Sequence, residues 1–254
     1  MSVNASSTLQ SIAVKLPGAT RVFEKLGIDY CCRGNRRLRD VCVGADLPVD
    51  QVLKSLEDAE KSASEDADEL KNWNNESLAD LIAHIVARHH GFVREQLERL
   101  DPLLVKVLAI HGEQHPELAR IRHLFEGLRN DLLDHLSKEE KLLFPYVLQL
   151  EAGANGERAV THPPFETLEA PLQQMIREHD EAGGQLREIR EASNHYLVPR
   201  DACLSYRELY QGLQALEEDL HQHMFLENYI LFPRAAKLEL TSPSRGTDIE
   251  DLPC

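Results

Sequence analysis

Apolar residues recur every three or four positions along most of the chain, the spacing that places them on one face of a helix. The pattern marks four long segments, over about 77–100, 116–150, 166–194 and 201–238. We expect the first to end near Asp101-Pro102, because proline removes a backbone donor and crowds the preceding turn. No segment alternates convincingly as a strand does. The predicted fold is therefore all-α, an antiparallel four-helix bundle, with interior leucines at Leu128, Leu132, Leu136, Leu143, Leu209, Leu213, Leu216 and Leu220.

The N-terminal part of the chain contains shorter helical segments. Residues 9–16, 17–26 and 49–63 have helical spacing, and Gly27 is predicted to end the second of them. Residues 61–77, KSASEDADELKNWNNES, are polar and acidic without such a period. We therefore expect a small helical domain with two adjacent cysteines over 1–65, a linker over 66–76, the bundle over 77–240 and a flexible tail over 241–254. Cys254, in that tail, is expected to have no chemical role.

The second and fourth segments of the bundle contain the same motif, D-L-x-x-H-x-x-x-E-x-x-x-L-F-P. It covers Asp131–Pro145 and returns 88 positions later at Asp219–Pro233. The first and third segments repeat more faintly, with His90 corresponding to His179 at a displacement of 89. The repeating unit is therefore a helical hairpin. A duplicated hairpin predicts a pseudo-twofold axis with a site on it.

A histidine and a glutamate four positions apart lie on one face of a helix, about 40° apart around its axis. This applies to His135 with Glu139 and to His223 with Glu227, and their apolar flanks turn that face inward. Interior polar groups are costly unless they form hydrogen bonds or bind metal. With the histidines of the other two helices, the interior offers four imidazoles and two carboxylates. Two metals could each take two histidines and share both carboxylates.

The donor types narrow the choice of metal. Nitrogen and oxygen ligands without thiolate favour iron or manganese over a structural zinc site, although the residues alone leave zinc open. The alternative is a set of hydrogen-bonded core histidines. Recurrence of the motif at equivalent positions, with matching histidines on the partner helices, favours the metal.

Two further carboxylates lie beside the candidate ligands. Asp131 comes four positions before His135, and Glu178 directly precedes His179. Either is a candidate for a hydrogen bond to a ligand histidine or for proton transfer, and Glu178 is the better one. The alternative is that each lies on a solvated helix face.

Composition limits the classes of partner. The 254 residues carry a formal net charge of −15, which opposes nucleic acid and anionic membranes as main partners. No run approaches the roughly 20 apolar residues that span a bilayer, and we find no secretory signal. Five cysteines, two of them adjacent, make a poor disulfide framework. We expect a cytoplasmic protein with reduced thiols, and the residues leave its oligomeric state open, a homodimer included.

The adjacent thiols of Cys31 and Cys32 lie in the small N-terminal domain, in the sequence DYCCRG. A disulfide between neighbours would close a strained ring, so a structural crosslink is not expected. Arginines follow at positions 33, 36, 37 and 39, and nearby cations lower the pKa of a thiol and favour its nucleophilic thiolate. We expect a thiol relay for iron or nitrosyl groups. The alternative is two small buried residues in a helical core.

The combined pattern resembles a known family. A histidine on the first helix, H-x-x-x-E on the second and a histidine on the third resemble the hemerythrin-like bundle. The second H-x-x-x-E, the Y-C-C-x-G motif at Tyr30–Gly34 and FLENYILFP at 225–233 resemble the Repair of Iron Centres proteins, over most of the chain up to about residue 238. The resemblance implies two non-haem iron ions, bridged by carboxylate and oxo groups, with ligands His90, His135, Glu139, His179, His223 and Glu227.

The same resemblance implies repair of iron–sulfur clusters damaged by nitric oxide or oxidants, by iron donation, nitric oxide handling or both. The implied partners are damaged iron–sulfur proteins or an apo-scaffold, with nitric oxide or dioxygen as a small ligand. One alternative is a di-iron reductase that joins two nitric oxide molecules into nitrous oxide. Another is a dioxygen carrier or sensor, although oxygen-carrying hemerythrins place a histidine where this chain has Gly183.

Overall fold

The computed structural model describes residues 3–16, 18–62, 72–156 and 165–241. Within these residues it contains α-helices, π-helical turns (η1 to η3) and no strand, which confirms the all-α prediction. The elements are α1 (Leu9–Lys15), α2 (Ala19–Lys25), α3 (Leu38–Gly44), α4 (Val49–Ser62), α5 (Leu78–His84), η1 (Ile85–His90), α6 (Gly91–His111), α7 (Glu117–Lys138), η2 (Glu139–Leu143), α8 (Phe144–Ala154), α9 (Glu169–Ala192), α10 (Leu204–Leu226), η3 (Glu227–Leu231) and α11 (Phe232–Thr241). Cys254 and most of the expected linker lie outside the described residues.

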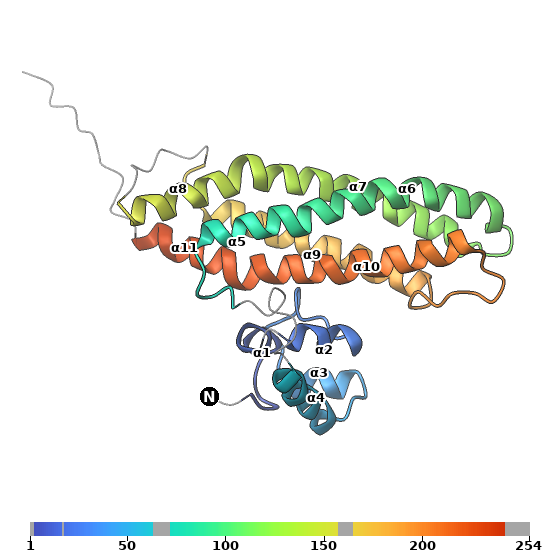
Figure 1. Ribbon diagram of the computed structural model, residues 1–254, viewed down its shortest axis with the longest axis horizontal. Helices are drawn as coiled ribbons and strands as arrows, with labels where there is room; N and C mark the ends of the chain where they lie inside the picture. The colour runs from blue at the N-terminus through green and yellow to red at the C-terminus, as the bar shows by residue number, and fades with distance from the viewer. Residues whose placement is uncertain (1–2, 17, 63–71, 157–164, 242–254) are drawn as a thin grey trace, which may run out of the picture.

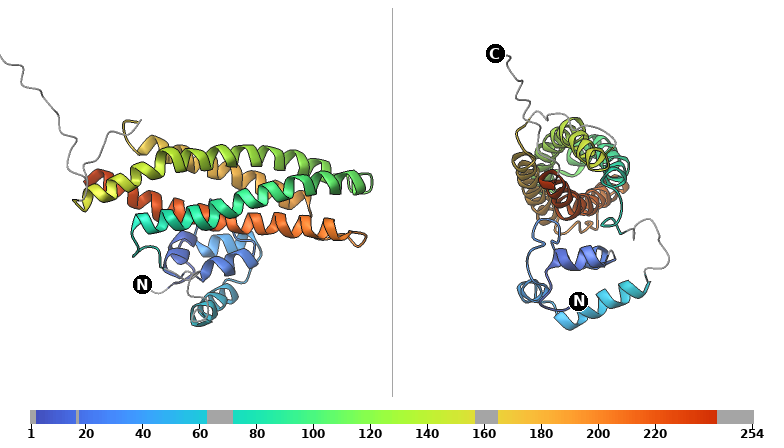
Figure 2. Two further views of the ribbon diagram at one scale, coloured as in Figure 1. Left: turned by 45° about the horizontal axis from the view of Figure 1, so that its top comes forward. Right: turned by 90° about the vertical axis from the view of Figure 1, so that its left-hand side faces the viewer.

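Four long rods of helix form the bundle (Figure 1). They consist of α5, η1 and α6; of α7, η2 and α8; of α9; and of α10, η3 and α11. Successive rods run antiparallel, and an end-on view shows them as a ring (Figure 2). Around that ring α6 contacts α7 and α10, and α9 contacts the same two helices, so the predicted antiparallel four-helix bundle is confirmed. None of the described helices is both long and apolar enough to cross a membrane.

The leucines assigned to the interior by their spacing are all buried. On α7, η2 and α10, each of the eight exposes 5% of its surface or less. Burying a leucine side chain is worth roughly 1.5–3 kcal/mol. These positions therefore supply much of the packing that holds the rods together and keeps water from the polar groups between them.

The first rod is longer than its sequence suggested. We expected it to end near Asp101-Pro102, but α6 continues through Pro102 to His111. Beyond the proline, Leu104 is fully buried. Nη1 of Arg122 in α7 donates to both the carbonyl and the carboxylate of Asp101. This packing and hydrogen bonding offset the backbone hydrogen bond that proline cannot make. The prediction considered only the proline and its neighbours in the sequence, so it did not include these tertiary contacts.

Helices α1 to α4 form a small domain beside the bundle (Figure 1). Gly27 ends α2 as predicted, since its φ of 65° is left-handed and the next amide, that of Ile28, donates to the carbonyl of Phe23. The chain then enters residues 29–34, called the thiol loop below. This loop runs between the small domain and the bundle.

The small domain packs on the bundle through α2 and the thiol loop. The ring of Tyr30 is fully buried, with its centroid 5.6 Å from that of Phe225 in α10. Oε1 of Glu24 lies 3.1 Å from Nδ1 of His221 in the same bundle helix. Burial opposes the charge on His221, but the hydrogen bond and charge of Glu24 raise its pKa. These contacts hold the thiol loop against the side of the bundle.

Candidate metal centre

Widened turns interrupt the helices at the predicted ligands. η1 ends at His90, η2 begins at Glu139 and η3 begins at Glu227. Such π turns are rare and concentrate at functional sites. Pro145 and Pro233 are the second residues of the helices that follow η2 and η3. A proline lacks the N–H that a preceding α-turn would use, which favours a wider turn before it. A π turn followed by a proline therefore occurs at the equivalent place in both copies of the repeat.

One group of potential ligands contains His90, His223, Glu139 and Glu227. The Nε2 atoms of His90 and His223 are 3.2 Å apart. Nε2 of His90 lies 3.4 Å from Oε2 of Glu139, and Nε2 of His223 lies 3.0 Å from Oε1 of Glu227. Two donors about 2.1 Å from a metal, at about 90–110° to each other, are roughly 3.0–3.4 Å apart. These spacings therefore suit one ion.

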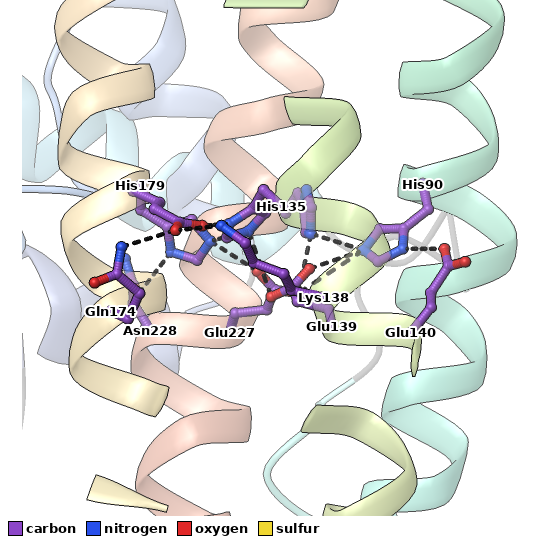
Figure 3. Close-up of polar contacts among 11 residues, drawn as sticks. His90, His135, Lys138, Glu139, Glu140, Gln174, His179, Glu227 and Asn228 are labelled. Atoms are coloured by element: carbon purple, nitrogen blue, oxygen red, sulfur yellow. Dashed lines mark hydrogen bonds and ion pairs between the residues drawn. The ribbon is translucent and has the colours of Figure 1, made fainter. Parts of the chain in front are cut away.

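A second group contains His135, His179 and the same two glutamates. The Nε2 atoms of His135 and His179 are 3.0 Å apart. Nε2 of His135 lies 3.4 Å from Oε1 of Glu139, and Nε2 of His179 lies 3.1 Å from Oε2 of Glu227. Each carboxylate thus presents one oxygen to each histidine pair, as a ligand that bridges two ions would (Figure 3). Each pair takes one histidine from each copy of the hairpin.

All six side chains are buried, and protein groups alone leave them poorly satisfied. None of the six residues as a whole exposes more than 4% of its surface. Both oxygens of Glu139 and Oε2 of Glu227 form no hydrogen bond within the described residues, although histidines lie beside them. Buried carboxylate oxygens without a hydrogen bond are costly, and imidazole nitrogens that face each other repel when both carry hydrogen. Two divalent cations would remove both penalties, so the donor set fits two metal ions.

Electrostatics within the site favour protonation of two of the four histidines, His135 and His90, when no metal competes for them, whereas burial lowers the pKa of His223. Burial opposes the charge on His135, but Glu139 and Glu178 raise its pKa to about 10. Burial also opposes the charge on His90, and Glu139 and Glu227 again raise the pKa. For Glu139, burial and Glu227 favour the neutral acid, yet the adjacent histidines lower its pKa. A metal must displace these protons, so its affinity rises with pH.

The two further carboxylates predicted near the ligands differ in position. Oε2 of Glu178 lies 2.8 Å from Nδ1 of His135, and Oε1 accepts from Lys138 at 2.8 Å. The hydrogen bond from His135 lowers the pKa of Glu178 to about 2. Asp131 instead accepts from Nε2 of Gln185 at 3.0 Å. Both carboxylates line a cavity of about 130 Å³ that also reaches His135.

Sequence reasoning missed two residues that orient two of the other three histidines, His90 and His179. Oε1 of Glu140 lies 2.7 Å from Nδ1 of His90, and Oδ1 of Asn228 lies 2.9 Å from Nδ1 of His179. Each directly follows a glutamate that the two groups share, at equivalent positions 88 residues apart. Comparing the two copies at these positions could have found them. Such outer partners determine which ring nitrogen carries the hydrogen and leave Nε2 free for a metal.

The thiol loop reaches the side of this site. Sγ of Cys32 lies 3.7 Å from the carbonyl oxygen of His179 and 3.6 Å from Sγ of Cys31, and both thiols are free. The expectation that arginines lower the thiol pKa is wrong for Cys31. Its pKa is raised well above the usual value by the hydrogen bond with Cys32, by burial and by Asp29. Arg33 pairs with Asp29 at 4.0 Å.

Comparison with known proteins gives matches over both domains. The hemerythrin HHE cation binding domain matches residues 81–235, and ScdA_N, a domain of unknown function, matches residues 5–60. A probable iron–sulfur cluster repair protein of Haemophilus influenzae is 36% identical over 230 residues, which cover 91% of this chain and 96% of that protein. Iron–sulfur cluster repair protein YtfE of Pectobacterium atrosepticum is 34% identical over 232 residues, which cover 91% of this chain and 97% of that protein. YtfE of Escherichia coli O81 is 33% identical over 227 residues, which cover 89% of this chain and 95% of that protein.

Proposed function

This chain belongs to the hemerythrin HHE cation-binding family, and we propose that it holds two iron ions and repairs iron–sulfur clusters damaged by nitric oxide or oxidants. The observation that carries the proposal is the pair of buried four-residue groups that share both Glu139 and Glu227. Relatives named as iron–sulfur cluster repair proteins, similar over nine-tenths of the chain, support it. We propose the cytoplasm as its compartment and damaged iron–sulfur proteins or an apo-scaffold as its clients. The proposed ligands are His90, His135, Glu139, His179, His223 and Glu227.

Two bound iron ions would supply neighbouring redox-active centres with exchangeable positions. The protein's own residues orient the ligands and control access to them. Glu178 stays ionised at neutral pH because its pKa is low, so it can accept the Nδ1 hydrogen of His135 and hold that ring in place. Four carboxylates line the cavity beside this histidine, against one lysine, so the cavity attracts cations. That lining suits the passage of iron(II), the cargo of repair.

Repair is tested with an iron–sulfur enzyme inactivated by nitric oxide. Iron-loaded protein is expected to restore its activity, and the His135→Ala variant is expected to do so poorly because one iron loses a ligand. Arg120→Ala, at an exposed position on α7, is the matched control and should repair as the native protein does. Native protein that holds two irons, shown by Mössbauer spectroscopy, yet restores neither the damaged enzyme nor an apo-scaffold would refute repair.

The cavity beside the ligands favours reduction of nitric oxide as a second activity. Its volume of about 130 Å³ admits diatomic molecules, and its wall includes apolar side chains from Leu132, Leu220 and Met224. Two molecules of nitric oxide, two protons and two electrons give nitrous oxide and water, and two iron(II) ions supply the electrons. Rapid mixing of the diferrous protein with nitric oxide is expected to release nitrous oxide. A stable iron–nitrosyl product without gas release would exclude this activity.

A further inference from the structure

The side chain of Asn228 bridges the thiol loop and a proposed metal ligand. Its Oδ1 lies 2.9 Å from Nδ1 of His179, a contact drawn in Figure 3. Its Nδ2 donates to the backbone carbonyl of Cys31 at 3.3 Å. Asn228 is the second residue of η3, directly after Glu227. One amide group therefore contacts both the N-terminal domain and the metal centre.

The loop determines the direction of both hydrogen bonds. A backbone carbonyl only accepts, so the amide atom that faces Cys31 is the donor Nδ2. Oδ1 of Asn228 then faces His179 and accepts, so Nδ1 of that ring carries the hydrogen. Nε2, which faces Glu227, keeps its lone pair for a metal. The docked loop thus selects the tautomer of one ligand.

The other half of the repeat has no such connection. Glu140 occupies the position equivalent to Asn228, and its carboxylate accepts from His90 whatever else is near. A carboxylate in place of Asn228 would hold His179 equally well, but it would set an acceptor against the carbonyl of Cys31. An amide is the residue type that serves both contacts. It occurs in the half of the bundle that faces the thiol loop.

The thiol loop packs against α9 at Gly183. A Cβ at this position would lie 2.8 Å from Sγ of Cys32, so glycine lets the thiol approach the helix this closely. At the adjacent Gly184, an added Cβ meets nothing within 4 Å. The amide of Gly34 donates to Oη of Tyr229 at 3.1 Å and anchors the end of the loop. Both contacts therefore hold the part of the loop that directly follows Cys31, the residue whose carbonyl accepts from Asn228.

We infer that Asn228 is a positioning residue through which the docked thiol loop orients His179, so that retention of one of the two metal ions depends on the N-terminal domain. The inference rests on the proposed di-iron centre. When the loop leaves, the amide is free to rotate, and His179 loses its fixed acceptor. The group of His135 and His179 then releases its metal faster. The group of His90 and His223 keeps its own outer partner and is unaffected.

The test is a double-mutant cycle on the iron-loaded full-length protein. Gly183→Leu puts a side chain where Cys32 lies, and Gly184→Leu is the matched control on the same helix. Asn228→Asp keeps an acceptor for His179 that does not depend on the loop. Loop release is measured as the rate at which a thiol reagent labels Cys32, read by mass spectrometry. Iron release is measured as the rate at which a ferrous chelator removes each ion, with Mössbauer spectra of the iron that remains.

Gly183→Leu is expected to speed labelling and to speed release of one iron about tenfold, the scale on which loss of a ligand's outer partner acts. Asn228→Asp is expected to speed labelling while iron release stays native, and adding Gly183→Leu should then change iron release no further. Asn228→Ala, a second variant, removes the acceptor outright and should release the same iron quickly.

Three results would overturn the inference. The first is an equal rate of Cys32 labelling in Gly183→Leu and Gly184→Leu. The second is a Gly183→Leu variant that releases both irons faster by the same factor. The third is an increase in iron release by Gly183→Leu that is the same with and without Asn228→Asp. Native protein that holds no iron would instead refute the proposed di-iron centre, so the two failures are distinguishable.

Discussion

Protein freed of metal by a chelator is expected to lose stability as the pH rises above 7, because His135 then loses a proton that the folded site holds. Burial opposes the charge on this imidazole, but Glu139 and Glu178 raise its pKa to about 10. An unfolded histidine titrates near pH 6.5. A group with a raised folded pKa stabilises the fold fully below the unfolded pKa, and this contribution is lost as the pH rises through the folded pKa.

The size of the effect follows from the gap between the two pKa values. Each pH unit between about 6.5 and 10 removes about 1.4 kcal/mol from the free energy of unfolding. Between pH 7 and pH 9.5 the loss from His135 is therefore about 3 kcal/mol. The side chain exposes 5% of its surface, so solvent screening reduces this value little.

The measurement is urea unfolding of the chelator-treated protein at several pH values, followed by circular dichroism. The His135→Asn variant lacks the titrating group, so its free energy of unfolding should be lower at pH 7 and should fall by about 3 kcal/mol less up to pH 9.5. All other groups titrate in both proteins, so the difference between the curves isolates His135. Equal slopes in the two proteins would refute the reasoning. The iron-loaded protein should also lack this slope, because a metal binds neutral imidazole.

Other parts of the structure give further predictions. Glu139→Gln is expected to lose both irons, because this carboxylate contacts both histidine pairs. Elemental analysis measures the iron content per chain, and one iron remaining in the variant would contradict this expectation. Leu128→Ala, at a fully buried position, should lower the free energy of unfolding by about 2–5 kcal/mol in urea, whereas the exposed Leu133→Ala should change it by about 0.5 kcal/mol or less. Gly34→Ala would bring a methyl group 2.8 Å from the hydroxyl of Tyr229, so thiol labelling of the loop should become faster, and an unchanged rate would contradict the docked geometry.

The fold and the proposed ligands could be predicted from the sequence because both depend on periodic patterns. Apolar residues at spacings of three and four positions indicate which face of each helix points inward. The duplicated motif places His135 and His223 at equivalent positions of the two hairpins, independently of the details of packing. The continuation of α6 through Pro102 could not be predicted in this way. It depends on Arg122 of another helix, 20 positions away in the sequence.

Contacts between the two domains were also beyond sequence reasoning. The arginines after the thiols suggested a lowered thiol pKa, but a list of neighbours along the chain says nothing of burial. In the fold Cys31 is fully buried beside Asp29 and Cys32, which reverses the direction. A thiol relay through this pair stays a prediction. The contact of Asn228 with the thiol loop was missed for a similar reason, because the carbonyl that it meets lies 197 positions earlier.

The outer partners of the ligands break the symmetry that the duplicated hairpin creates. Glu178, directly before His179, holds His135, but the equivalent position before His90 is His89. His89 lies 3.1 Å from a carboxylate oxygen of Asp219, and Nδ1 of His223 has no hydrogen-bond partner among the described residues. Ligands with different outer partners differ in basicity and in freedom of orientation. Two irons held here should therefore be inequivalent, with two distinct Mössbauer quadrupole doublets, whereas one shared doublet would show that the ligands alone determine the electronic structure.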